Sequence, residues 1–146
     1  MGKCICLSRV STGVQDLDQQ TDQLLAAARS NGYSDEEIIK IEDIESGIKL
    51  SEEERYGLTK MKSIINSEQI DRVIVYEISR LGRRPDVLYA VRDFLIKNKV
   101  QLQILNPSFL MLKSDGTLDE NSNILFYLFS GFAEAGFYSE VQRFEA

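Results

Sequence analysis

Four arginines and one serine are the residues of this chain that could do chemistry on a phosphate. Arg9 and Ser11 stand near the start, Arg80 and Arg83 stand in the middle, and Arg55 lies between these pairs. A guanidinium offers five donors in a planar fork that matches phosphate oxygens, and its charge is permanent. Phosphoryl transfer depends mainly on positioning and on stabilising negative charge. A cluster of such arginines with a serine is what phosphoryl transfer to a side-chain hydroxyl would need.

Each of these residues also has a simpler interpretation. Ser11 and Thr12 are ordinary helix-capping residues, and a single arginine is more often a solvated surface residue. An apolar run before Arg9 indicates a strand, and ligands of open α/β sheets usually bind beyond the carboxyl ends of strands. Position alone does not overturn the simpler interpretation.

Composition indicates one globular domain. The chain has 146 residues, 43% of them hydrophobic, and no histidine. No stretch approaches the roughly 20 apolar residues of a membrane span, so we expect a cytoplasmic protein. Cys4 and Cys6 alternate in a predicted strand and are too close to form a disulfide, so we expect reduced core thiols. Without histidine the usual zinc ligand sets are missing, and we expect neither a metal nor another cofactor.

Charge is unevenly distributed along the chain. The net charge of −6 argues against nucleic-acid binding, because duplex affinity depends largely on Lys and Arg at phosphates. From Asp71 to Lys99, however, seven basic and four acidic residues give a local charge of +3, which leaves −9 for the rest. This asymmetry is compatible with a small basic site on an acidic body.

Strand-like and helix-like stretches alternate four times. The predicted strands are residues 3–8, 38–42, 72–77 and 100–105, and the predicted helices start at Asp16 or Asp18, at Ser51 and at Pro85. The alternation predicts an α/β fold with a mostly parallel central sheet flanked by helices. A last helix, predicted from Asp119 to Arg143, is apolar on most of its circumference, which favours burial against a partner subunit as well as the sheet.

Five short motifs occur in a fixed order along the chain. They are Arg9-Val10-Ser11-Thr12 with Gln15 and Gln20, Asp43-x-x-Ser46-Gly47, Arg55-x-Gly57-Leu58, Ser79-Arg80-Leu81-Gly82-Arg83, and Phe132-Ala133-Glu134 with Arg143. In this order they resemble the catalytic domain of the serine site-specific recombinases, the resolvases and DNA invertases. The resemblance covers nearly the whole chain.

The resemblance implies a reaction. Ser11 attacks a DNA phosphodiester and forms a phosphoseryl link to the 5′ end, after which strands are exchanged and rejoined. The covalent link stores the phosphodiester energy, so neither ATP nor a metal is required. It further implies double-stranded DNA as partner and self-association, with dimers at rest and tetramers at synapsis. We expect residues 1–118 to form the catalytic domain and 119–146 to begin a long oligomerisation helix, with the DNA-binding domain beyond this chain.

Roles for single residues follow by resemblance. Arg9, Arg80 and Arg83 would hold the scissile phosphate. Further phosphate contacts would come from Arg55 and Arg143. Asp43 and Ser46 would orient the arginines or the nucleophile, and Gln15 and Gln20 would support them. Arginine is a poor base, so these residues leave open which group deprotonates Ser11.

Two positions depart from the family's pattern. The family commonly has Asp at the position of Ser79, and Glu-Arg at Gly136-Phe137. Alternate strand residues face the same side, so we hypothesise that Glu77, with Asp43, supplies the missing negative charge. The alternative is that Glu77 merely ends a strand with a solvated charge.

Two other functions remain open on the sequence. One is a catalytically inactive relative that serves as a DNA-associated dimerisation module. The other is an unrelated flavodoxin-like signalling domain, which predicts an acidic pocket in place of an arginine cluster.

Overall fold

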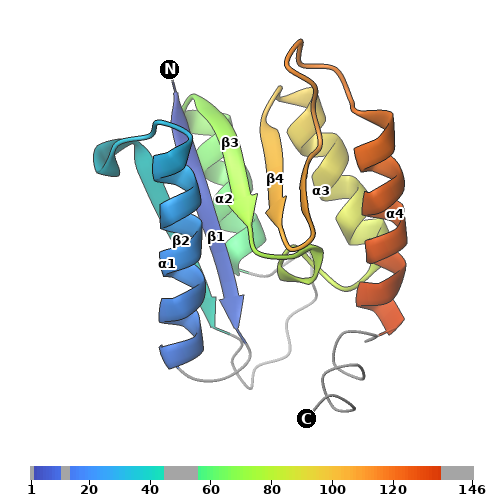
Figure 1. Ribbon diagram of the computed structural model, residues 1–146, viewed down its shortest axis with the longest axis horizontal. Helices are drawn as coiled ribbons and strands as arrows, with labels where there is room; N and C mark the ends of the chain where they lie inside the picture. Colours follow the sequence, from blue (N-terminus) through green and yellow to red (C-terminus); the bar gives the residue numbers. More distant parts are fainter. Residues whose placement is uncertain (1, 11–13, 45–55, 136–146) are drawn as a thin grey trace.

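The computed structural model describes residues 2–10, 14–44 and 56–135 as a five-stranded sheet with helices on both faces (Figure 1). In spatial order the strands are β2 (Ile38–Ile44), β1 (Lys3–Val10), β3 (Ile70–Val75), β4 (Gln101–Leu105) and β5 (Ser108–Leu110). The first four are parallel and β5 is antiparallel to β4. The expected α/β fold with a mostly parallel sheet is confirmed.

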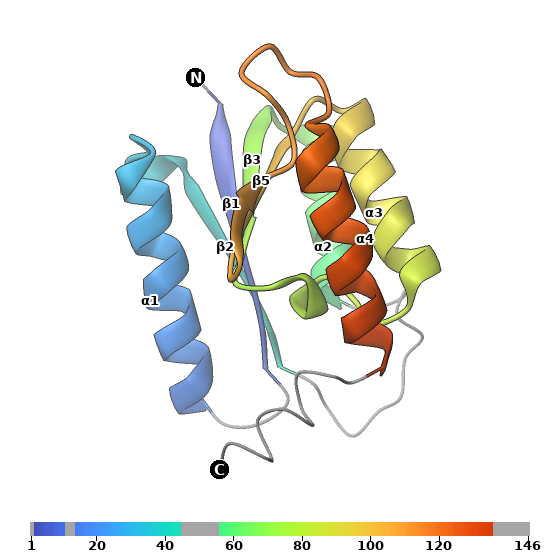
Figure 2. The same ribbon diagram turned by 45° about the vertical axis from the view of Figure 1, so that its right-hand side comes forward.

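Helices cover the two faces of the sheet unequally. The α-helices are α1 (Val14–Ser30), α2 (Tyr56–Ser67), α3 (Pro85–Lys97) and α4 (Glu120–Ala135), and the short 3-10 helices are η1 (Asp35–Glu37) and η3 (Ile78–Arg80). Helix α1 lies alone on one face, whereas α2, α3 and α4 lie on the other (Figure 2). Helix α4 packs on α3 and on η3. Within the described ranges, no helix is long and apolar enough to cross a membrane.

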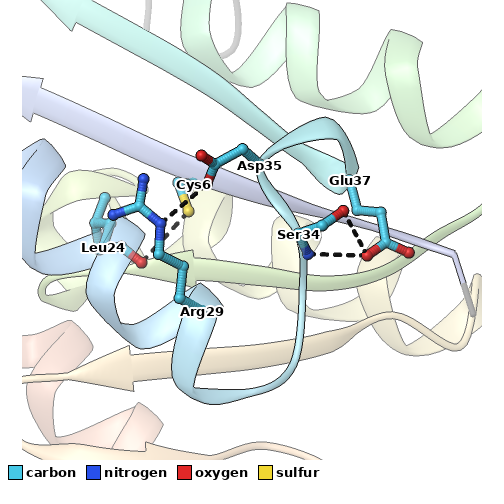
Figure 3. Close-up of polar contacts among 6 residues, drawn as sticks. All are labelled: Cys6, Leu24, Arg29, Ser34, Asp35 and Glu37. Atoms are coloured by element: carbon cyan, nitrogen blue, oxygen red, sulfur yellow. Dashed lines mark hydrogen bonds and ion pairs between the residues drawn. The ribbon is translucent and has the colours of Figure 1, made fainter.

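Side-chain alternation in β1 divides the core between the two faces. Cys4 and Cys6 are buried towards α1, while Ile5 and Leu7 are buried towards α2 and α3. Both cysteines are free thiols, as expected, and Cys6 Sγ lies 3.6 Å from the Leu24 carbonyl oxygen of α1 (Figure 3). A hydrogen bond with Cys6, together with burial, raises the pKa of the Cys4 thiol. These cysteines belong to the core.

Polar contacts fix the path from α1 to β2. Gly32 adopts a φ of +93°, a conformation that favours glycine, just after α1 ends. Arg29 Nε then donates to Asp35 Oδ1 at 3.0 Å, and the backbone N–H and hydroxyl of Ser34 both donate to Glu37 Oε1 at 2.9 Å (Figure 3). These two Ser34 donors hold the pKa of Glu37 below its usual value. The turn places β2 parallel to β1, with Ile38 paired with Cys4.

Several element boundaries differ from the predictions. Strand β3 ends at Val75, so Glu77 is not a strand residue and instead precedes η3. After β4, the chain passes a cis Asn106–Pro107 bond and returns as β5, which the sequence pattern did not predict because it has only three residues. The helix start predicted at Ser51 and the part of the last predicted helix beyond Ala135 lie outside the described residues.

Candidate active site

Polar residues gather where β1, β2 and β3 end. Parallel strands present their carboxyl ends at one edge of the sheet, the lower edge in Figure 1. Arg9 lies at this end of β1, Asp43 lies at this end of β2, and the segment from Tyr76 through η3 follows β3. The predicted site residues that the structure describes in this region therefore come from three neighbouring strands.

The end of β1 is held by a side chain of α1. Strand β3 pairs with β1 only as far as Leu7 and Val75. Two residues later, the Arg9 N–H donates to Gln20 Oε1 at 3.0 Å, and Gln20 Nε2 donates to the Arg9 carbonyl at 3.4 Å. The buried Gln20 amide thus takes the place of the missing strand. It fixes the backbone two residues before Ser11.

Arg9 and Asp43 are neighbours across β1 and β2. They are register partners, and alternation places them on the α2 face of the sheet with Leu7 and Ile41. Arg9 is only 9% exposed. Asp43 Oδ2 accepts the Gly57 N–H of α2 at 3.2 Å. The sheet therefore places a carboxylate beside the arginine, and α2 holds this carboxylate.

Gly57 allows α2 to approach Asp43. A Cβ atom at position 57 would lie 2.8 Å from Asp43 Oδ2 and 3.2 Å from Leu7 Cδ1. We expect Gly57→Ala to lower the free energy of unfolding by about 1–2 kcal/mol, because overpacking outweighs the better helix propensity of alanine. Chemical denaturation measures this change. Gly131→Ala in α4 is the control, since no neighbouring atom of the described residues lies within 4 Å of its Cβ position and helix propensity should stabilise it. Equal stabilisation of both variants would contradict the close approach.

Glu77, Ser79 and Arg80 form a hydrogen-bonded group at η3. Glu77 Oε1 accepts the Ser79 hydroxyl at 2.9 Å and lies 3.1 Å from Arg80 Nη2. The prediction that Glu77 and Ser79 share one side of a strand was wrong, because the backbone turns after Val75. The turn itself brings them together, since the Arg80 N–H donates to the Glu77 carbonyl at 3.0 Å. Glu77 is 9% exposed, which contradicts the alternative of a solvated charge.

A polar pocket lies between α1 and the segment that follows β3. It has a volume of about 170 Å³, and its described lining residues are Gln19, Gln20, Gln23, Tyr76 and Arg80. None of these is acidic, which speaks against a flavodoxin-like acidic pocket. Amide, hydroxyl and guanidinium donors suit phosphate oxygens. Sequence reasoning missed Gln19, Gln23 and Tyr76, although the spacing of the two glutamines predicts one face of a helix.

The remaining predicted residues are not all brought to this pocket. Arg9 is not among the described lining residues, and only its backbone is joined to the pocket residue Gln20. Arg83 is exposed on the loop between η3 and α3. Gln15 lies in α1, but its side chain is outside the described part. The other predicted positions that lie outside the described residues are Ser11, Thr12, Ser46, Arg55 and Arg143.

Comparison with known proteins shows the family and the fold of this chain. The family described as "Resolvase, N terminal domain" matches residues 4–143. Two relatives from Staphylococcus aureus, the transposon Tn552 resolvase and the Tn552 DNA-invertase BinR, are 35% and 34% identical over 127 residues. These alignments cover 87% of this chain but only 56% and 57% of the relatives, so the chain spans little more than half their length.

Solved structures share the fold. The N-terminal catalytic domain of TP901-1 integrase superposes with a TM-score of 0.60 at 28% identity, and the match covers 97% of both chains. A resolvase family site-specific recombinase from Streptococcus pneumoniae has a TM-score of 0.63 at 18% identity, covering 98% of this chain and 95% of the other. Because the family match and the relatives extend over most of its length, this chain belongs to the resolvase and invertase family of serine site-specific recombinases, in which it corresponds to the N-terminal catalytic domain.

Proposed function

We propose that this chain cleaves and rejoins double-stranded DNA with Ser11 as nucleophile. The observation that carries the proposal is the position of Arg80. Arg80 lines a polar pocket together with Gln20, and Gln20 holds the backbone of Arg9, two residues before Ser11. A nucleophile placed there would have a phosphate-binding cation beside it.

The proposed reaction has two steps. Ser11 Oγ forms a bond to phosphorus, the bond to the 3′ oxygen breaks, and this oxygen leaves with a proton as a 3′ hydroxyl. After strand exchange, a 3′ hydroxyl attacks the phosphoserine, restores the phosphodiester and returns the proton to Ser11. Arg9, Arg80 and Arg83, with Arg55 and Arg143, stabilise the negative charge on the phosphate in both steps. DNA in bacterial cells lies in the cytoplasm, where we propose that the protein works.

Covalent capture from cells tests this proposal and identifies the DNA site in the same experiment. The full-length protein is expressed with a purification tag, cells are lysed in denaturant, and DNA that remains attached to the protein is sequenced. We expect attached DNA whose protein-linked 5′ ends fall at a few defined positions. Absence of attached DNA, with the protein folded and expressed, would favour a catalytically inactive dimerisation module.

We also propose that the chain associates with itself through α4. Ile124, Tyr127 and Leu128 are 65%, 45% and 51% exposed, and their spacing places them on one stripe. Tyr127 is tied to α3 by an edge contact with Tyr89 and by the Arg92 guanidinium, which lies 5.0 Å from the centre of its ring. A second copy that covers this stripe would form the dimer, and pairs of dimers would form the synaptic tetramer.

Leu128→Glu tests the role of this stripe. Glutamate keeps the helix propensity of leucine but places a charge in the proposed interface. We expect the variant to sediment as a monomer at concentrations at which the parent is a dimer, with unchanged circular dichroism. Leu110→Glu is the control, because Leu110 is also exposed, at 40%, but lies on β5. A variant that still dimerises, or a parent that is monomeric, would contradict the interface.

A further inference from the structure

The carboxylate of Glu77 is placed to control the geometry of Arg80. The Glu77 side chain is 11% exposed and the Arg80 side chain is 28% exposed, so water screens this ion pair only in part. Burying a carboxylate is costly unless it is paired and hydrogen-bonded. Glu77 satisfies both conditions through Oε1, which accepts from Ser79 and contacts Arg80.

The backbone of η3 holds Glu77 and Arg80 close together. Glu77 has an extended conformation and caps η3, and its carbonyl accepts the Arg80 N–H. Ile78 and Leu81, on either side of Ser79 and Arg80, are 2% and 0% exposed. Helix α4 packs against η3. Because the turn is anchored by its apolar residues, the two polar side chains have few alternative positions.

Arg80 also lines the polar pocket, as does Gln20. The same side chain therefore contacts a buried carboxylate through Nη2 and lines the pocket. An ion pair on one edge of a guanidinium restricts rotation of the whole planar group. The carboxylate thereby orients the donors that a phosphate in the pocket would use.

We propose that Glu77 is a positioning residue that presets Arg80 for the DNA phosphate, with the Ser79 hydroxyl holding the same carboxylate oxygen. Glu77 itself does not touch DNA or the reacting atoms. This inference rests on the proposed function for its effect on cleavage, but the contact with Arg80 stands independently of that function. The role proposed for Glu77 explains why a buried carboxylate lies beside a pocket suited to an anion. Electrostatic repulsion alone would disfavour this arrangement.

The test compares three variants by two readouts. The variants are Glu77→Gln, the double variant Glu77→Gln/Ser79→Asp, which moves the carboxylate two residues along, and the control Glu68→Gln. Glu68 also contacts a cation, Lys3, at 2.7 Å, but on the exposed surface. The first readout is the rate of covalent adduct formation, measured with DNA from the captured site. The second is the NMR signal of Arg80 Nε, assigned by its loss in Arg80→Lys, with and without inorganic phosphate.

For Glu77→Gln we expect adduct formation at saturating DNA to slow about 10- to 100-fold, because a poorly positioned group loses catalysis without losing binding. The DNA concentration at half-maximal rate should change little. The Arg80 signal should show greater side-chain motion and a smaller phosphate-induced shift. The double variant should recover to within about threefold of the parent, since the two positions are coupled. Glu68→Gln should match the parent in both readouts.

The proposal is overturned if Glu77→Gln forms adduct at the parent's rate or leaves the motion of Arg80 unchanged. It is also overturned if Glu77→Gln is slow but the double variant is not rescued, because the loss is then structural. Should Glu77→Gln fail to fold, Ser79→Ala decides: we expect this variant to increase the motion of Arg80, because it frees the carboxylate that holds the guanidinium, and unchanged motion would overturn the proposal. If the parent forms no adduct at all, the proposed function fails, while the NMR readout still decides the role of Glu77.

Discussion

Ser11→Ala is expected to abolish the covalent link between this protein and DNA while leaving duplex binding intact. The hydroxyl is the only group of Ser11 that can form a phosphate ester, and removal of a nucleophile typically costs more than about 10³-fold in rate. Binding depends on the cationic groups around the phosphate, which the substitution keeps. The Gln20 bonds to Arg9 hold the preceding backbone in both proteins.

The measurement uses denaturing gels of the full-length protein with DNA from the captured site, in which a nick traps the cleaved state. Ser30→Ala is the matched control, because Ser30 is an exposed serine at the far end of α1. We expect this control to form adduct as the parent does. Adduct that persists in Ser11→Ala would show that another residue is the nucleophile.

Arg80→Ala is expected to have the second largest effect. Its guanidinium is the cation among the described residues that line the pocket. Loss of one preorganised group that stabilises transition-state charge costs about 10²- to 10³-fold in rate. The substitution also leaves Glu77 buried without this cation, so the negative charge of the carboxylate would then repel the phosphate.

Arg80→Lys separates charge from geometry. Lysine restores the positive charge but not the planar fork, so we expect a rate between those of Arg80→Ala and the parent. Single-turnover adduct formation measures all three proteins. Arg29→Ala is the control, because Arg29 is on α1 and contacts Asp35 on the exposed surface. A rate for Arg80→Ala within a few fold of the control would remove Arg80 from the site.

Sequence patterns predicted the fold well where periodicity is strong. The apolar run from Cys4 to Leu7 indicates a strand buried on both faces. In the structure, Cys4 and Cys6 lie on one face of β1, and Ile5 and Leu7 lie on the other. Pro85 was predicted to lie in the first turn of a helix, and it is the first residue of α3. In these segments, local preference and tertiary packing agree.

The site was less predictable because its contacts join distant parts of the chain. The hydrogen bonds between the Gln20 side chain and the Arg9 backbone form because β3 ends before it can pair with Arg9. The contact of Asp43 with Gly57 depends on how closely α2 approaches β2. The pattern predicts a strand that includes Glu77, because residues 73–76 are apolar and strand-like. The chain instead turns into η3, where Ile78 is buried. Such strand ends are set by packing rather than by local pattern.

Mass spectrometry of the captured adduct tests the central claim most directly. The adduct is digested with trypsin and nuclease, and the peptide that retains a nucleotide is fragmented. We predict a single nucleotide joined through its 5′ phosphate to Ser11. A nucleotide on any other residue, or one joined through its 3′ phosphate, would contradict the proposed mechanism.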